Sequence, residues 1–255
     1  MLLAIDIGNS HTVIGLFNGD TLAYDWRIQT NIKNTADEIA STLHGLFSMR
    51  GLHFTGIGGI IIANVVPPLQ NSWLAFARTI AVEPLIVNEQ LQTGIPILTD
   101  NPAEVGADRI VNAVAGFHKY ATSLIIVDFG TATTFDCVSS QGEYMGGAIS
   151  PGLAISLDAL GKHAARLPHI HAAPPQNAIG KNTISAIQSG VLFGYGGLVQ
   201  GLVSRLSAEF PAPQPLVIAT GGMAQIITPY APAIKKIVPQ LTLEGLKLIY
   251  DRCHP

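Results

Sequence analysis

The residues best suited to chemistry stand in a motif that occurs twice in the sequence. Residues 5–12 read Ile-Asp-Ile-Gly-Asn-Ser-His-Thr, and residues 127–134 read Val-Asp-Phe-Gly-Thr-Ala-Thr-Thr. In each copy an acidic residue, Asp6 or Asp128, ends an apolar run, and a Gly, a short polar turn and a second apolar run follow. The copies lie about half a chain apart in a sequence of 255 residues. This spacing predicts two related halves, each opening on a strand–turn–strand element.

A turn of this composition can bind a phosphate group and its counterion. Its backbone N–H groups have no strand partner, and glycine lets a phosphate approach the main chain closely. An Asp at a strand end can hold a cation, which neutralises phosphate charge. The alternative is two ordinary β-hairpins in which Asp and Gly only shape the turn. The two copies favour a pair of turns that clamps one polyphosphate, with further hydroxyl donors in Ser10, Thr12, Thr131, Thr133 and Thr134.

A loop at residues 101–109 places an acidic residue at an expected helix start. It reads Asn-Pro-Ala-Glu-Val-Gly-Ala-Asp-Arg. Asp108 can be a structural first-turn acid, because a negative charge near a helix N-terminus is stabilising. It also suits a base that orients and deprotonates an attacking hydroxyl, since it stands beside Arg109 and after a Gly. The residues alone leave both interpretations open.

Three further turns could contribute to a site. Residues 146–152 form a glycine-rich strand-to-helix turn, which is either a tight turn or the wall of a cleft. Residues 179–183 precede a helix, and Lys181 and Thr183 there are either solvated or within reach of an anion. Residues 219–223 follow a buried strand, where a Gly-Gly pair can accept the flat face of a base or ribose.

Hydrophobic periodicity and turn residues predict an α/β fold with one order of elements in both halves. A helix at about 107–119 is expected to connect the halves as a hinge. The first half is expected to contain strands at 2–7, 12–17, 21–28, 57–63 and 85–87 and helices at about 35–49 and 69–81. The second is expected to contain strands at 124–129, 132–138, 143–149 and 215–219 and helices at about 153–166 and 183–209.

The last of these helices contains an unusual number of glycines. Each costs a helix about 1 kcal/mol relative to Ala. Close packing against another backbone is the expected reason, and a ligand is the alternative. The glycines are Gly190, Gly194, Gly196, Gly197 and Gly201.

The amino-acid composition and net charge limit the kinds of ligand and the cellular compartment that fit this chain. With 48% hydrophobic and 12% charged residues, the chain fits strands buried on both faces and apolar surface covered by a partner subunit. The net charge of −3 and the absence of a basic stripe in the sequence argue against nucleic acid as a main ligand. Cys137 and Cys253 fit a reducing compartment and have no metal-ligand spacing. Residues 1–4 lack the basic start of a signal peptide. The longest apolar run, residues 60–66, is far too short to span a bilayer. A cytoplasmic protein is therefore expected.

Taken together, these motifs resemble the type III pantothenate kinase family, within the acetate and sugar kinase/heat-shock ATPase/actin superfamily. Each motif alone is modest, and the set in this order and spacing is specific. The resemblance runs the whole length and rests on residues 6–10, 106–109, 128–133, 146–152 and 179–183 and on the Gly221-Gly222 pair.

The resemblance implies a fold of two duplicated RNase H-like (actin-like ATPase) halves, each a mixed five-stranded sheet with flanking helices. The halves would be residues 1–115, with the first phosphate turn, and 116–255, with the second phosphate turn and the Gly-Gly nucleotide turn. The implied activity is ATP-dependent phosphorylation of pantothenate to 4′-phosphopantothenate, the first step of coenzyme A biosynthesis. Family members are dimers with the substrate pocket near the dimer interface, so a homodimer is expected.

The family's site residues carry over motif by motif. The resemblance implies Asp108 as the proton acceptor, Asp128 as a ligand of a monovalent cation (K⁺ or NH₄⁺) and Asp6 as lying near Mg²⁺. Pantothenate contacts are implied for Gly106, Ala107, Asp108, Arg109 and Thr183. ATP contacts are implied for Asp6, Ile7, Gly8, Asn9, Ser10, His11, Thr12, Val13 and Thr131.

The sequence departs from the family pattern at one position. Relatives often have a Tyr two residues before the Asn-Pro of the 101–109 loop, where this chain has Thr99, so any substrate contact of that Tyr does not carry over. Two alternatives remain. Residues 106–109 and 179–183 argue against a superfamily kinase for another small hydroxylated substrate. The retained acidic site residues and the lack of a basic patch argue against a non-enzymatic transcriptional accessory protein on the same scaffold.

Overall fold

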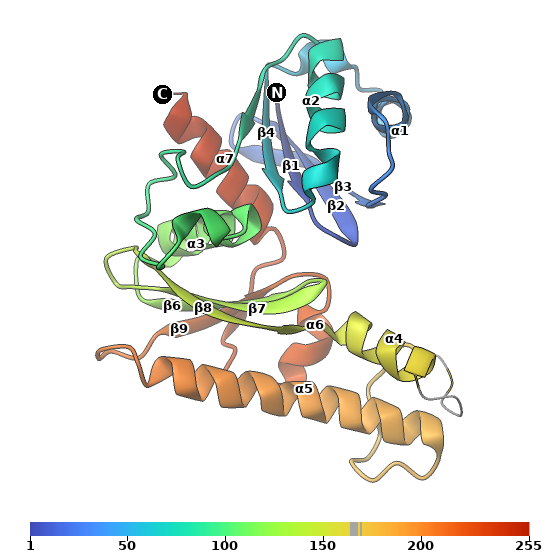
Figure 1. Cartoon of the computed structure of the whole chain (residues 1–255), viewed down its shortest axis with the longest axis vertical. Coiled ribbons are helices and arrows are strands. Elements are labelled where there is room, and N and C mark those ends of the chain that lie inside the picture. The colour runs from blue at the N-terminus through green and yellow to red at the C-terminus, as the bar shows by residue number, and fades with distance from the viewer. Residues whose placement is uncertain (164–167, 169, 255) are drawn as a thin grey trace. The chain divides into compact units, whose positions relative to one another are not determined.

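The computed structural model describes residues 1–163, 168 and 170–254, and it divides into two compact units (Figure 1). Unit 1 comprises Met1–Ile95, Asp100–Ala115 and Thr242–Pro255, and unit 2 comprises Pro96–Thr99 and Gly116–Leu241. The C-terminal segment therefore belongs to the same unit as the N-terminal strands.

Unit 1 is built on a five-stranded mixed sheet in the order β3-β2-β1-β4-β5. The β1–β2 and β2–β3 pairs are antiparallel, and the β1–β4 and β4–β5 pairs are parallel. The central strand β1 is apolar on both faces and almost entirely buried, as a strand covered by helices on both sides must be. The strands are β1 (Leu2–Ile7), β2 (His11–Asn18), β3 (Thr21–Gln29), β4 (Gly59–Asn64) and β5 (Pro84–Ile86).

Helices cover both faces of this sheet. On one face α1 (Ala36–Ser48) and α2 (Gln70–Thr79) pack their apolar side chains on β1, β2 and β4. The other face packs on α3 (Ala107–Tyr120) and α7 (Leu241–Cys253). At the start of α1, Thr35 and Glu38 form a reciprocal capping box.

Unit 2 repeats the plan with the order β10-β9-β6-β7-β8. Its central strand β6 has the same burial pattern as β1, and its antiparallel pairs again lie on one side and its parallel pairs on the other. The predicted fold of two mixed five-stranded sheets with flanking helices is therefore confirmed. The strands are β6 (Leu124–Phe129), β7 (Ala132–Val138), β8 (Tyr144–Pro151), β9 (Leu216–Thr220) and β10 (Lys236–Ile237).

The helices of unit 2 are dominated by α5 (Thr183–Ser207), which lies along one face of the sheet in Figure 1. By length and composition alone, α5 could cross a bilayer, but one such helix is weak evidence and its inner face packs in the core of unit 2. The shorter helices are α4 (Leu153–His163) and α6 (Ala224–Ile227). The predicted continuation of α4 to residue 166 lies outside the described residues.

Candidate active site

The first phosphate turn connects β1 to β2 and is closed by its own backbone. Gly8 N donates to His11 O at 3.1 Å. A Cβ at Gly8 would lie 3.0 Å from that same oxygen, so a larger residue fits poorly. Asn9, Ser10 and His11 are exposed. The turn therefore presents its backbone to a ligand, as an anion-binding turn must.

Asp6 and Thr12 flank this turn in different environments. Asp6 is partly buried in β1 and lies opposite Val13 of β2 and Ala63 of β4. It thus stands near the carboxyl end of a parallel strand pair, where ligands bind in open α/β sheets. The Thr12 side chain is only 2% exposed.

The second turn connects β6 to β7 and is tighter. Gly130 N donates to Ala132 O at 3.1 Å. Thr131 is partly buried, and Thr133 is 1% exposed. Among the described residues, the Thr133 hydroxyl has no hydrogen-bond partner.

The loop after β8 packs directly on the second turn. A Cβ at Gly152 would lie 2.2 Å from Thr131 O and 2.7 Å from Gly130 O. Carbon and oxygen atoms do not approach so closely without a bond, so only glycine fits. The glycine-rich segment at 146–152 therefore supports the backbone of the second turn.

Asp128 lies beside two glycines of unit 2. A Cβ at Gly221 would lie 2.4 Å from Asp128 Oδ1, and one at Gly130 would lie 3.7 Å from the same atom. Gly221 also has a φ of 90°, which favours glycine. The missing side chain of Gly221 thus leaves the space that the Asp128 carboxylate occupies.

Asp108 stands in the first turn of α3. Gly106 O accepts hydrogen bonds from Arg109 N (3.0 Å) and Ile110 N (3.2 Å), so the helix starts at this glycine. Arg109 N also donates to Asp108 Oδ1 at 2.8 Å. Burial raises the pKa of the Asp108 carboxyl above its ordinary value, and the amide and charge of Arg109 offset only part of this effect. A raised pKa strengthens the carboxylate as a proton acceptor.

Val65 connects the Asp108 loop to the first phosphate turn within unit 1. It follows β4, and its N–H donates to Ile7 O at 3.1 Å. Its Cγ1 lies 3.5 Å from the position that a Cβ of Gly106 would take. The first turn and the start of α3 therefore meet at the same edge of the unit 1 sheet.

Thr99 lies in a short segment that pairs with β8. Tyr144 N donates to Pro96 O and Leu98 N donates to Tyr144 O, both at 2.8 Å. The Thr99 methyl group lies 3.7 Å from the Cβ position of Gly146. Its hydroxyl is buried and has no partner within the described residues. Thr99 thus packs against β8 rather than standing on an open surface.

Thr183 is the first residue of α5 and is exposed. Asn182 caps the helix, because its Oδ1 accepts from Ser185 N at 2.9 Å.

The site residues expected from the sequence fall into two groups and one separate position. Residues 6–13 and 106–109 belong to unit 1, residues 128–134 and 219–223 belong to unit 2, and Thr183 begins α5.

The sequence motifs did not indicate Thr30, which contacts the first turn. Thr30 Oγ1 donates to Gly8 O at 2.7 Å, and Thr30 N donates to Ser10 O at 3.0 Å. The one indication in the sequence is its position directly after the third of three consecutive antiparallel strands, because the end of that strand lies beside the turn between the first two strands. No residue type there distinguishes it from an ordinary strand end.

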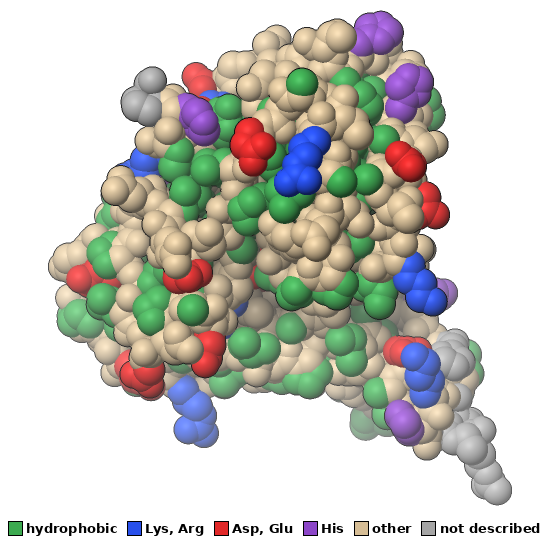
Figure 2. Space-filling view, turned by 45° about the horizontal axis from the view of Figure 1, so that its top comes forward, with side chains coloured by type: hydrophobic (Ala, Val, Ile, Leu, Met, Phe, Trp, Pro, Cys, Tyr) green, Lys and Arg blue, Asp and Glu red, His purple; other side chains and the backbone are tan. Residues whose placement is uncertain are grey.

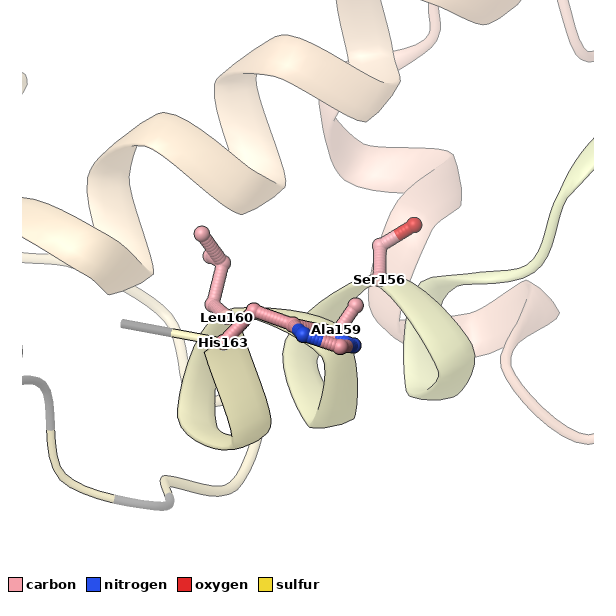
Figure 3. A pocket seen from close by; sticks show the side chains of 4 residues that line it. All are labelled: Ser156, Ala159, Leu160 and His163. Carbon is pink, nitrogen blue, oxygen red and sulfur yellow. The ribbon is translucent and has the colours of Figure 1, made fainter. Parts of the chain in front are cut away.

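Surface features add little to this site. A hollow of about 540 Å³ lies on α4 and is lined by Ser156, Ala159, Leu160 and His163 (Figure 3), none of which carries the expected chemistry. On the face shown in Figure 2, Lys and Arg side chains are scattered rather than clustered. Within the described part of the chain, no group of three or more His, Cys, Asp or Glu residues could hold a metal ion by itself. A cation at either Asp would therefore need phosphate, backbone or water oxygens to complete its ligands.

Comparison with known proteins identifies close relatives in sequence. A family model described as type III pantothenate kinase matches residues 2–205. A type III pantothenate kinase of Syntrophus aciditrophicus is 50% identical over 253 residues, covering 99% of each chain. One from Geobacillus sp. (strain WCH70) is 49% identical over 253 residues, covering 99% of this chain and 98% of the relative.

Solved structures share the fold at low sequence identity. A conserved putative Baf family transcriptional activator from Campylobacter jejuni has a TM-score of 0.64 at 18% identity, covering 99% of this chain and 98% of that chain. An inorganic polyphosphate/ATP-glucomannokinase from Arthrobacter sp. has a TM-score of 0.53 at 15% identity, covering 100% and 99%. Likenesses at this identity indicate a common fold and carry no argument about activity.

Proposed function

The chain belongs to the type III pantothenate kinase family, and we propose that it transfers the γ-phosphoryl group of ATP to the primary hydroxyl of pantothenate. The products are 4′-phosphopantothenate and ADP, in the first step of coenzyme A biosynthesis. In the structure, the observation that supports this best is the Val65 contact, because it keeps an open phosphate turn and the Asp108 loop at one sheet edge. A turn suited to binding the phosphoryl donor and a candidate proton acceptor thus lie in the same unit.

Asp108 is the proposed proton acceptor. The pantothenate hydroxyl oxygen forms a bond to the γ-phosphorus while the bond from that phosphorus to the β–γ bridging oxygen breaks and ADP leaves. The hydroxyl proton passes to the Asp108 carboxylate and then to solvent. Phosphoryl transfer depends mainly on positioning and charge stabilisation, so the base mainly orients the nucleophile. Pantothenate is expected to contact Gly106, Ala107, Asp108, Arg109 and Thr183.

The phosphate turns are proposed to hold ATP. The first turn contributes backbone N–H groups from the exposed residues that follow Gly8, and Thr131 contributes from the second. A bound Mg²⁺ supplies charge neutralisation of the phosphates, and Asp6 at the end of β1 is its proposed protein ligand. Asp128, beside the space at Gly221, is the proposed ligand of a monovalent cation, K⁺ or NH₄⁺. Proposed ATP contacts are Asp6, Ile7, Gly8, Asn9, Ser10, His11, Thr12, Val13 and Thr131.

A single assay tests the proposed reaction. Wild-type protein with ATP, Mg²⁺, K⁺ and pantothenate should form ADP and 4′-phosphopantothenate in equal amounts. DNA binding should be negligible at physiological salt, because the net charge is −3 and the sequence has no cluster of Lys and Arg residues to neutralise DNA phosphates. ADP release that is no faster with pantothenate than without it would defeat the substrate assignment. Salt-sensitive DNA binding without any product would instead support a regulator.

We also propose that the protein is a cytoplasmic homodimer in which the exposed face of α5 is covered by a second copy. Four α5 glycines have open space where a Cβ would stand, so no contact with the residues that the structure describes requires a glycine at these positions. Gly196 differs, because its Cβ would lie 2.3 Å from Tyr230 O. Phe193, which precedes one of these glycines, is 44% exposed. The open glycines are Gly190, Gly194, Gly197 and Gly201.

Replacing Gly194 by Leu tests this interface. A Cβ at this position would meet nothing among the described residues, and removal of a helical glycine should stabilise an isolated subunit by about 1 kcal/mol. Across a close helix contact, however, the added side chain should separate the subunits. Light scattering should therefore show a dimer for the wild type and a species of about 26.9 kDa for Gly194→Leu.

The matched control is Gly45→Leu on α1, which is also helical, exposed and surrounded by open space. It should remain dimeric and unfold at a higher temperature than the wild type. A dimeric Gly194→Leu variant would place the interface elsewhere. A monomeric wild type at micromolar concentration would contradict the dimer itself.

A further inference from the structure

The first phosphate turn is held from one side by a single residue that lies outside the motif. Thr30 follows β3 (Thr21–Gln29) and makes two hydrogen bonds to carbonyl groups of the turn. Its hydroxyl donates to Gly8 O at 2.7 Å, and its backbone N–H donates to Ser10 O at 3.0 Å. Two of the turn's carbonyl oxygens therefore point toward Thr30 and away from a ligand.

The direction of the hydroxyl contacts follows from proton count. Thr30 Oγ1 lies 2.9 Å from Thr12 Oγ1, and either atom could donate by geometry alone. Because the one hydroxyl proton of Thr30 is used on Gly8 O, which can only accept, the Thr12 hydroxyl must be the donor to Thr30. The Thr12 proton is thus directed inward, in agreement with its 2% exposure. The result is an ordered chain of donors from Thr12 through Thr30 to the Gly8 carbonyl.

This chain fixes the direction of the next N–H group. In a trans peptide unit the C=O and N–H groups point in opposite directions. Since Gly8 O points toward Thr30, the N–H of Asn9, which belongs to the same peptide unit, points away from Thr30. Asn9 is exposed, and no partner for its amide is found in the part of the chain that the structure describes. An outward N–H in a glycine turn is the kind of donor that binds phosphate oxygens.

We infer that Thr30 is a positioning residue for the binding of nucleotide phosphates. It does not touch the ligand, and it acts by orienting the Gly8–Asn9 peptide, whose N–H group is the donor. The inference rests on the proposed kinase function for its ligand. It assigns the buried Thr12 hydroxyl to the same chain of donors, so the proposed contact of Thr12 with ATP is made by its backbone. Loss of the Thr30 hydroxyl leaves the Gly8 carbonyl without this donor, so the peptide can rotate and the Asn9 donor is lost to the ligand.

Thr30→Val is the informative variant, because it removes the hydroxyl and keeps the β-branched shape. Titration calorimetry with Mg·ADP should show affinity about tenfold weaker than wild type, the scale of one lost hydrogen bond to a charged group. In steady-state assays the KM for ATP should rise by a similar factor, while the KM for pantothenate stays within about twofold. Thr30→Ser keeps the hydroxyl and should retain wild-type ADP affinity within about twofold.

Two further variants make the test specific. Thr21→Val, an exposed Thr on the same β3 strand, should leave ADP affinity unchanged. Thr12→Val leaves the Thr30–Gly8 bond in place and should weaken ADP binding less than Thr30→Val does. The reverse order would mean that the Thr12 hydroxyl contacts phosphate directly and would overturn the assignment.

A merely structural role for Thr30 gives a different pattern. In that case Thr30→Val would lower the unfolding temperature while ADP affinity and both KM values stayed at wild-type levels. If Thr30→Val does not fold, Thr30→Ala and Thr30→Ser can be compared instead, because Ala lacks the hydroxyl and Ser retains it. The calorimetry needs no pantothenate, so a wild type that binds Mg·ADP but does not phosphorylate pantothenate would defeat the proposed function and leave the Thr30 comparison valid.

Discussion

Replacing Asp108 by Asn should lower turnover by about 10²–10⁴-fold, the usual effect of removing a general base. The variant should keep its fold, because an Asn Oδ1 can accept the same hydrogen bond from Arg109 N. Rates measured at saturating ATP and pantothenate check this. Circular dichroism and Mg·ADP binding should be close to wild type.

The same substitution should raise the free energy of unfolding at neutral pH. Burial raises the folded-state pKa of Asp108 above its unfolded value of about 3.8, so the charged carboxylate costs stability above the folded-state pKa. That cost disappears below the unfolded pKa, where the group is neutral in both states. Urea unfolding of Asp108→Asn should therefore show a stability gain at pH 7 that shrinks as the pH falls through the folded-state pKa of Asp108 and reaches zero below the unfolded pKa of about 3.8. Over the same window, wild-type kcat/KM should fall as the base becomes protonated.

Asp100→Asn provides the matched control, because Asp100 is exposed and lies just before the same loop. It should leave turnover unchanged. A variant Asp108→Asn with wild-type kcat would show that Asp108 is only a first-turn acid of α3. A loss of stability at pH 7 would mean that its hydrogen bond outweighs the cost of its burial.

The fold could be predicted because the strongest local signals repeat. Each of the strands β1 and β6 is an apolar run with an Asp at its penultimate position, and both are followed by a glycine turn and an antiparallel partner. Element ends differ from expectation by one or two residues, as at β9, which begins at Leu216. β10 has only two residues, too few for a periodic pattern, and was not located.

The last helix shows a different limit of the sequence. Its residues carry an amphipathic signal, but nothing local says that α7 packs in unit 1 after a chain that has just built unit 2. That placement comes from tertiary packing, in which Gly245 stands against Val111 and Thr242 Oγ1 donates to Asn112 Oδ1 at 2.8 Å. Such long-range contacts have no periodic signature in the sequence.

The candidate site shows the same difference between local sequence signals, which can be read directly, and long-range contacts, which cannot. Motif residues such as Gly8 and Gly106 could be proposed from the sequence because a glycine in a turn is a local signal. In the structure a Cβ at Gly8 would lie 3.0 Å from His11 O, and one at Gly106 would lie 2.6 Å from Asp108 Oδ1. Thr30 and Val65 could not, because they act only through folding contacts with those motifs and have no unusual residue type. A raised pKa for Asp108 was likewise invisible in the sequence, because burial is a property of the folded state.

Activity should depend on a monovalent cation held at Asp128. A carboxylate beside a phosphate turn repels ATP, and a cation bound there weakens that repulsion. Wild-type rates should be higher in potassium or ammonium salts than in sodium or Tris salts, on the order of tenfold, since about 1.4 kcal/mol of charge stabilisation produces that factor. Asp128→Asn should remove the difference between the salts. Equal wild-type rates in all four salts would reject the cation site.

The Gly221→Ala variant tests whether the geometry of that carboxylate, rather than its charge alone, creates the site. The new Cβ would lie 2.4 Å from Asp128 Oδ1 and 2.7 Å from Phe129 N, and the backbone atom cannot move aside without distorting β6. The carboxylate must then shift, so the potassium effect should be lost although Asp128 is still present. Gly19→Ala is the matched control, because Gly19 also has a positive φ, 57°, but open space around its Cβ position. The control bears a backbone strain of about 1 kcal/mol and should keep the full potassium effect. If Gly221→Ala keeps it too, the cation is bound by atoms other than the Asp128 carboxylate.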